Sequence, residues 1–223
     1  MLPSKKKGFP VSFALKGIPF LFYKMTNMDS VKLDQTFWNN TYKTDSTPWD
    51  IGHISPPIKN FVDSLPDRNL SILIPGGGKS HEAVYLHENG FSNVHVCDWA
   101  ALAFESLKMK CPNFPEEHII IGDFFNIEGQ YDLILEQTFF CALLPSQRAN
   151  YVNKVADLLK EGGMLAGLLF ASHFETPGPP FGGTKNEYLA LFGKLYDILV
   201  METAQNSILP RMGNELFFKM KKK

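Results

Sequence analysis

The chain has 223 residues, a length typical of one generous domain, with 44% apolar and 13% aromatic residues. This composition supplies enough apolar surface for a core and excludes disorder over most of the chain. The 22 basic and 23 acidic residues give a net charge of -1, which leaves no electrostatic footprint for nucleic acid. No apolar run approaches the roughly 18 residues of a membrane span.

The first residues stand apart from this composition. Three lysines precede an apolar stretch, residues 9–23, which Pro10 and Pro19 interrupt. The stretch faintly resembles a signal peptide, but no small-residue cleavage site follows it. We interpret residues 1–27 as a flexible N-terminal extension and residues 28–223 as a single domain.

From residue 70 onward, short apolar runs alternate with segments of helical spacing. The last two segments, separated by Pro210 and Gly213, are typical of an antiparallel strand pair. We expect Gly162 and Gly163 to end the third helix. The alternation predicts an α/β fold, a mostly parallel sheet with helices on both faces. The strands are expected at residues 70–74, 94–97, 118–121, 131–135, 164–170, 196–203 and 215–220, and the helices at residues 80–89, 100–110, 146–160 and 184–195.

Distinctive residues follow four successive strands. Glycines follow the first strand, and Asp98, Asp123 and Glu136 follow the next three. Ligands of such sheets bind at the carboxyl ends of the strands. Three acidic strand ends beside a glycine loop therefore indicate a nucleoside-binding site rather than ordinary turn chemistry.

The glycine loop, Pro75 to Glu82, matches no common motif completely. A phosphate-binding G-x-x-x-x-G-K-[ST] loop needs glycine where Leu73 stands, which weakens a phosphotransferase interpretation. A dinucleotide G-x-G-x-x-G loop needs glycine where His81 stands. A nucleophile elbow needs glycine where Glu82 stands.

What remains is a turn at Gly76 and Gly78 with a carboxylate, Asp98, 22 residues beyond Gly76. An acceptor-only carboxylate at a strand end suits the two ribose hydroxyls of a nucleoside. Asp123, or the backbone at Phe124, is then placed to meet the adenine amino group. This set predicts an adenosyl ligand without a pyrophosphate.

Beyond these features, the chain from Phe37 to its C-terminus resembles the thiopurine methyltransferase superfamily, and most closely its halide/thiol branch. The resemblance is carried by Phe37-Trp38, Tyr42, the sequence Thr47-Pro48-Trp49-Asp50-Ile51-Gly52, the loop Ile74-Pro75-Gly76-Gly77-Gly78 with His81-Glu82, Asp98, Asp123-Phe124, Tyr131-Asp132-Leu133-Ile134, Phe139-Phe140-Cys141-Ala142-Leu143 and Gly178-Pro179-Pro180-Phe181. It implies a seven-stranded Rossmann-like sheet, S-adenosyl-L-methionine as cofactor and an N-terminal lid at residues 28–60. Tyr42, Ser80, Gln137 and Phe170 depart from the family pattern, which bears mainly on the acceptor.

The cofactor that the resemblance implies carries a sulfonium cation. Trp38, Tyr42 and Trp49 can offer aromatic faces to it or to the adenosyl group, each worth ~0.5 to 2 kcal/mol when desolvated. Glu136 is expected to bind the cofactor's amino group, with a general base for a protonated thiol as the other interpretation.

Methyl transfer by direct displacement depends on orientation and water exclusion, so no catalytic residue beyond positioning groups is expected. The expected acceptor is a small thiol or halide, in a pocket walled by Gln137, Phe140, Phe170 and Phe181. Thiopurine-type aromatic thiols are the alternative acceptors. A non-catalytic regulatory protein that retains the fold is the non-enzyme alternative.

The remaining expectations concern the cellular setting. Cys97, Cys111 and Cys141 contain no C-x-x-C pair, which favours reduced thiols and a cytoplasmic location. His95 and Cys97 share a strand face, but two ligands do not make a zinc site, so we expect no metal. The expected protein is a monomer whose partner is its small-molecule acceptor, without nucleic acid or membrane.

Overall fold

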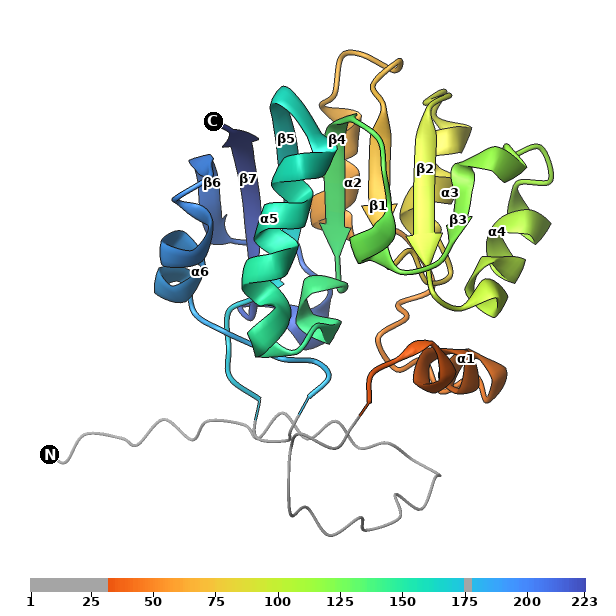
Figure 1. Ribbon diagram of the computed structural model, residues 1–223, viewed down its shortest axis with the longest axis horizontal. Coiled ribbons are helices and arrows are strands. Elements are labelled where there is room, and N and C mark those ends of the chain that lie inside the picture. Colours follow the sequence, from red (N-terminus) through yellow and green to blue (C-terminus); the bar gives the residue numbers. More distant parts are fainter. Residues whose placement is uncertain (1–31, 175–177) are drawn as a thin grey trace, which may run out of the picture. The chain divides into compact units, whose positions relative to one another are not determined.

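A computed structural model describes residues 32–174 and 178–223, and residues 32–223 form one compact unit. The N-terminal extension expected at residues 1–27 lies outside the described residues. The unit is built on a seven-stranded sheet in the order β3-β2-β1-β4-β5-β7-β6 (Figure 1). The strands are β1 (Ile72–Pro75), β2 (Val94–Asp98), β3 (Ile119–Ile121), β4 (Tyr131–Gln137), β5 (Leu159–Phe170), β6 (Tyr196–Thr203) and β7 (Glu215–Lys222).

The first five strands are parallel, and β7 runs antiparallel to both β5 and β6. The mostly parallel sheet with an antiparallel C-terminal pair is confirmed. Because the sheet order reverses between β1 and β4, a crevice is expected at the carboxyl ends of these two strands. The helices are α1 (Gln35–Lys43), α2 (Pro56–Asp63), α3 (His81–Glu88), α4 (Glu105–Lys110), α5 (Arg148–Leu158) and α6 (Lys185–Phe192).

Each face of the sheet has its own apolar core. On one face, Tyr151 of α5 and Phe192 of α6 pack with Ile134 of the sheet. On the other, Ile58 of α2 and Leu86 of α3 belong to a second cluster. Since both faces are covered, the central strands are apolar without alternation, as the four buried residues of β1 show.

Helix α2 is absent from the sequence prediction, which placed residues 56–60 in a lid. Pro56 and Pro57 begin the helix, and Ile58, Phe61 and Val62 lie on one buried face. Proline is tolerated in the first helical turn because the N–H it lacks has no partner there. The burial of α2 assigns it to the core, so the segment that can act as a lid is shorter. We call residues 32–55 the lid segment.

The expected end of the third predicted helix is also wrong. α5 ends at Leu158, and the chain passes directly into β5, which begins five residues earlier than predicted. Leu159 pairs with Tyr131, whereas the next pair is Leu133 with Met164, so β5 carries a bulge. Gly162, with φ +69°, lies within this bulge and does not end the helix.

Helix α1 lies at the edge of the sheet where the parallel strands end (Figure 1). Asp34 begins it by accepting a hydrogen bond from the backbone N–H of Phe37 at 3.0 Å. None of its residues is buried. The side-chain amide of Gln35 donates to the carbonyl of Trp99, just beyond β2, at 3.2 Å. The helix is thus held at the rim of the strand ends without belonging to the core.

Within the described residues, no helix is both long and apolar enough to cross a membrane.

Candidate functional site

The glycine loop (residues 75–80) follows β1 and leads into α3. Gly76 and Gly78 have φ +58° and +53°, which glycine adopts without strain. A Cβ on Gly76 would lie 2.9 Å from the Cβ of Phe139, closer than real contacts allow. Both conformation and space therefore require glycine at position 76.

Ser80 occupies a position with the same backbone requirement. Its φ is 60°, its side chain is buried, and its hydroxyl donates to the carbonyl of Gly78 at 3.1 Å. This local hydrogen bond compensates part of the cost of a left-handed conformation at a non-glycine residue. Ser80 thus keeps a left-handed backbone conformation in the loop without being glycine.

Asp98, the last residue of β2, lies beside this loop. One carboxylate oxygen accepts from the backbone N–H of Gly78 at 3.1 Å, and the other from that of Ala100 at 2.9 Å. Burial raises the pKa of Asp98, while these backbone donors oppose the shift. The structure brings the predicted carboxylate against the glycine loop.

The three aromatic residues predicted to face the cofactor lie together. The Trp49 ring lies 5.7 Å from that of Trp38 and 6.2 Å from that of Tyr42, both edge to face. Trp38 and Tyr42 lie on α1, whereas Trp49 follows in a turn. A Cβ on Gly78 would lie 3.1 Å from the Tyr42 hydroxyl, so Tyr42 covers the glycine loop. Burial raises the pKa of Tyr42, and the nearby Asp98 adds to the shift.

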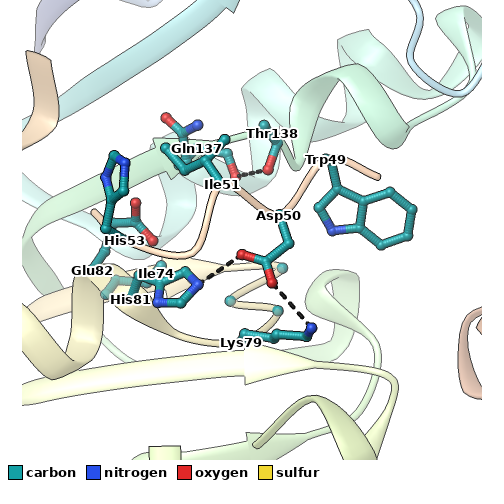
Figure 2. Close-up of a pocket in the computed structure, with 13 residues that line it drawn as sticks. Trp49, Asp50, Ile51, His53, Ile74, Lys79, His81, Glu82, Gln137 and Thr138 are labelled. Carbon is teal, nitrogen blue, oxygen red and sulfur yellow. Dashed lines mark hydrogen bonds and ion pairs between the residues drawn. The ribbon is translucent and has the colours of Figure 1, made fainter. Parts of the chain in front are cut away.

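A network of charged groups joins the lid segment to α3. Asp50 lies 2.8 Å from His81 and 3.0 Å from Lys79, and it also accepts from the backbone N–H of Gly52 at 2.8 Å (Figure 2). Burial opposes ionisation of Asp50, but these three donors hold its pKa below the usual value. Lys79 also pairs with Asp45 at 3.1 Å. Asp50 and His81 carry part of the family resemblance, but the sequence did not predict that they form this network with Lys79.

Between the lid segment and the glycine loop lies a cavity of about 50 Å³. Its wall combines three parts of the chain that are distant in sequence: the turn after α1, the glycine loop with the start of α3, and the end of β4. Figure 2 shows the lining residues, which are Trp49, Asp50, Ile51, His53, Ile74, Gly76, Gly77, Gly78, Lys79, His81, Glu82, Gln137 and Thr138.

The segment after β4 contributes Gln137 and Thr138. The Gln137 side-chain oxygen is buried and has no hydrogen-bond partner among the described residues. Thr138 has φ 60°, which is costly for a β-branched residue and is found mainly at functional sites. The strained turn holds Gln137 on the cavity wall.

Glu136 lies at the end of β4, as expected, but its carboxyl group is engaged by internal donors. Its carboxyl group is 1% exposed and accepts hydrogen bonds from Phe139 N at 2.9 Å, Phe140 N at 2.8 Å and the Tyr151 hydroxyl at 2.7 Å. Burial raises the pKa of Glu136 to about 7. With three internal donors, the carboxyl group supports the turn after β4, and we no longer expect it to contact the cofactor.

Phe140 is also placed differently from the prediction. It is 1% exposed and packs against Tyr151, Tyr188 and Phe192 in the core, so its ring cannot wall a pocket. The neighbouring Phe139 is partly exposed and contacts Gly76 instead. The run of two phenylalanines gave no signal for which ring faces the site.

The remaining predicted residues lie in two places. Asp123 accepts from the backbone N–H of Phe125 at 2.9 Å, and the Phe124 ring is buried, which leaves only its backbone for a ligand. Phe170, at the end of β5, and Phe181 are both partly exposed. The loop around Phe181 is anchored by Arg148, which donates to the carbonyls of Phe181 and Gly182 at 3.1 and 2.9 Å.

The structure therefore gathers a strand-end carboxylate and an aromatic cluster around the glycine turn, and this turn and Trp49 line the cavity. Within residues 32–174 and 178–223, no group of three His, Cys, Asp or Glu side chains is arranged to hold a metal ion. The arrangement suits a nucleoside ligand held by backbone and carboxylate, with aromatic faces for a cation.

Comparison with known proteins gives consistent results. The thiopurine S-methyltransferase family profile matches residues 33–219. A probable thiol methyltransferase of Arabidopsis thaliana is 29% identical over 83% of this chain and 84% of its own length. A thiopurine S-methyltransferase of Aliivibrio salmonicida is 30% identical over 72% of this chain and 83% of its own. A thiocyanate methyltransferase of Arabidopsis thaliana is 26% identical over 83% of this chain and 84% of its own length.

Solved structures of methyltransferases share the fold. The magnesium protoporphyrin IX methyltransferase of Synechocystis, solved with S-adenosylmethionine, has a TM-score of 0.64 at 13% identity, covering 89% of this chain and 100% of its own. The didemethyltoxoflavin N-methyltransferase of Burkholderia thailandensis, solved with S-adenosylhomocysteine, has a TM-score of 0.67 at 16% identity, covering 85% and 87%.

Proposed function

The chain belongs to the thiopurine S-methyltransferase family, and we propose that it transfers a methyl group from S-adenosyl-L-methionine to a small soft nucleophile, a thiol or a halide. One observation carries the proposal. The glycine loop and Trp49 of the lid segment line one cavity, and Asp98 and Tyr42 lie against the same loop, at the strand ends where such sheets bind ligands.

The residues present fit this cofactor. Positions 76 and 78 have the positive φ that glycine tolerates, so the backbone can approach a ligand closely. We assign the ribose hydroxyls to Asp98, the adenine amino group to Asp123 or the backbone of Phe124, and the aromatic contacts to Trp38, Tyr42 and Trp49. When bound, the cofactor would supply a sulfonium methyl group, whose carbon an in-line nucleophile would attack while the neutral thioether, S-adenosylhomocysteine, leaves.

The chain's part in the reaction is to position the cofactor and the acceptor and to exclude water. Because Asp50 ties the lid segment to Lys79 and His81, closure of this segment shields the reacting atoms from solvent. A thiolate or halide arrives as an anion and needs no general base. We therefore propose that the residues of the site only position the cofactor and the acceptor. The rate advantage then comes from the orientation of the two reactants.

The wall of the acceptor pocket is proposed to contain Gln137, Phe170 and Phe181, with Phe139 in place of Phe140. This wall is largely apolar and carries a neutral amide, which suits a small polarisable acceptor better than a carboxylated or phosphorylated one. The relative named as a thiol methyltransferase supports this acceptor class.

Thiopurine-type aromatic thiols are the second candidate acceptors. The observation in their favour is the relative named as a thiopurine S-methyltransferase, which is 30% identical. A planar aromatic acceptor would stack on the phenylalanine rings of the same wall.

We also propose a cytoplasmic monomer. The support is that Cys97, Cys111 and Cys141 are all free and buried, as expected for a protein kept in reducing surroundings.

Titration calorimetry with S-adenosylmethionine, S-adenosylhomocysteine and ATP tests the cofactor. We expect binding of the two adenosyl ligands, and tight ATP binding without either of them would overturn the methyltransferase proposal. Headspace detection of methyl iodide and methanethiol, beside an assay with an aromatic thiol, tests the acceptor. Methylation of the aromatic thiol alone would select the second candidate.

A further inference from the structure

Glu82 is a buried carboxyl group on the wall of the cavity. It lies in the first turn of α3, its side chain belongs to a residue that is 7% exposed, and it lines the cavity beside Gly78 and Gln137. Figure 2 shows the side chain rising from α3 toward the lid turn that carries Ile51 and His53. Neither the sequence analysis nor the proposed mechanism assigns it a function.

Glu82 has little compensation for its burial. Its one hydrogen bond from another residue comes from the backbone N–H of Ser55, at 3.5 Å, the outer limit of such a bond. Among the described residues, no Lys, Arg or His side chain forms an ion pair with it. The nearby Arg211 is engaged elsewhere, with Glu215 at 3.4 Å and the Trp49 carbonyl at 2.7 Å. Burial accordingly raises the pKa of Glu82.

The other acid on the cavity wall shows the contrast. Asp50 has three donors within 3.0 Å, and two of them are the side chains of Lys79 and His81. Asp50 is therefore neutralised by the chain itself, whereas Glu82 is not. A buried carboxylate without a cationic partner is costly, so a ligand that brings a fixed positive charge would be bound favourably there.

We propose that Glu82 binds the α-ammonium group of the cofactor's amino-acid end, with the side-chain oxygen of Gln137 as a second acceptor. This inference rests on the proposed function, because it takes the cofactor to be an adenosyl amino acid. An ammonium group has three N–H donors and no acceptor, and the cavity offers it a carboxylate and an unpartnered amide oxygen. The assignment places the charged end of the cofactor on the α3 side of the glycine loop and its ribose on the Asp98 side.

Calorimetry with three matched ligands tests the proposal on the full-length protein. The ligands are S-adenosylhomocysteine, its analogue lacking only the α-amino group, and its analogue lacking only the carboxyl group. For Glu82→Gln, we expect binding of the two ligands that retain the amino group to weaken about 10- to 100-fold, as for a lost charge-assisted hydrogen bond. The affinity for the analogue without the amino group should stay within about twofold, because that ligand has no partner for Glu82.

Glu215→Gln is the matched control, since Glu215 is also buried and pairs with Arg211 but does not line the cavity. It should change the affinity for all three ligands equally or not at all. Equal weakening of all three ligands by Glu82→Gln, or no weakening, would overturn the role of Glu82. Absence of adenosyl-ligand binding by the folded wild-type protein would instead overturn the proposed function on which this inference rests.

Discussion

At the scale of single residues, the site depends on carboxyl groups with different surroundings. Asp98 is held by backbone N–H groups beside the glycine loop, Asp50 by cationic side chains on the cavity wall, and Glu136 by three internal donors. The same chemical group is thus a proposed ligand group in Asp98, a tether in Asp50 and a support in Glu136, according to what surrounds it.

Asp98→Ala removes the group assigned to the ribose hydroxyls. We expect it to weaken binding of S-adenosylhomocysteine by about 1.5 to 3 kcal/mol, the loss typical of hydrogen bonds to a charged acceptor. Calorimetry measures the change, and Asp98→Asn, which keeps the shape, should lose less. An unchanged affinity in the alanine variant would show that the sugar is bound elsewhere.

Glu136→Gln tests the pH dependence of stability. The folded-state pKa of Glu136 is raised from 4.5 to about 7, so the folded protein holds this proton more tightly than the unfolded chain. Its stabilising contribution is full below pH 4.5 and is lost as the pH rises through about 7. Urea unfolding at pH 5 and pH 8 should show the wild type losing on the order of 3 kcal/mol relative to the variant.

The exposed Glu128→Gln provides the control for this comparison, because its side chain is solvated in both states. A difference between wild type and Glu136→Gln that stayed constant from pH 5 to pH 8 would contradict the assignment.

At the scale of elements, the site is assembled from segments that the core holds only at their ends. α1 contributes no buried residue, yet Trp38 and Tyr42 reach Trp49 and the glycine loop. The loop around Phe181 is fastened by the Arg148 side chain of α5 and by the backbone N–H of Phe181, which donates to the carbonyl of Cys141 at 2.6 Å. Both segments lie at the strand ends, the edge at which sheets of this kind bind ligands.

Arg148→Met should loosen the loop around Phe181. The variant loses two hydrogen bonds to backbone carbonyls and the contact of the guanidinium with the Phe140 ring at 4.8 Å. We expect the KM for the acceptor to rise about tenfold while the Kd for S-adenosylhomocysteine stays unchanged, because Arg148 does not line the cofactor cavity. Steady-state kinetics with varied acceptor and calorimetry separate the two effects.

Arg68→Met is matched to this change, since Arg68 also donates to a backbone carbonyl, that of Val62, and covers the Phe91 ring at 4.5 Å. It should affect stability without affecting the KM. A rise in KM in both variants would mean that Arg148 acts through general stability alone.

At the scale of the whole molecule, the sheet and its strand-end residues follow from the sequence, because apolar runs and glycine turns report local structure directly. The prediction from sequence failed at positions whose structure is decided by packing between elements that are distant in the chain. The bulge in β5 depends on pairing of Leu159 with Tyr131, and the burial of Phe140 depends on helices α5 and α6. The ion network at Asp50 joins residues 29 or more positions apart, Asp50 to Lys79 and His81, and no local pattern encodes it.

Because apolar cores pack against both faces of the sheet, the molecule depends on the close approach of neighbouring strands within it. Gly167 of β5 faces Glu136 of β4, and a Cβ there would lie 2.7 Å from the Cβ of Glu136 and even closer to its carbonyl oxygen. Gly167→Ala must therefore separate two central strands or shift the support of the turn after β4. We expect a loss of about 3 kcal/mol or more in urea unfolding, together with weaker binding of S-adenosylhomocysteine. Gly122→Ala, where a Cβ meets open space, should stay within about 0.5 kcal/mol of the wild type, and equal losses in both variants would refute the steric argument.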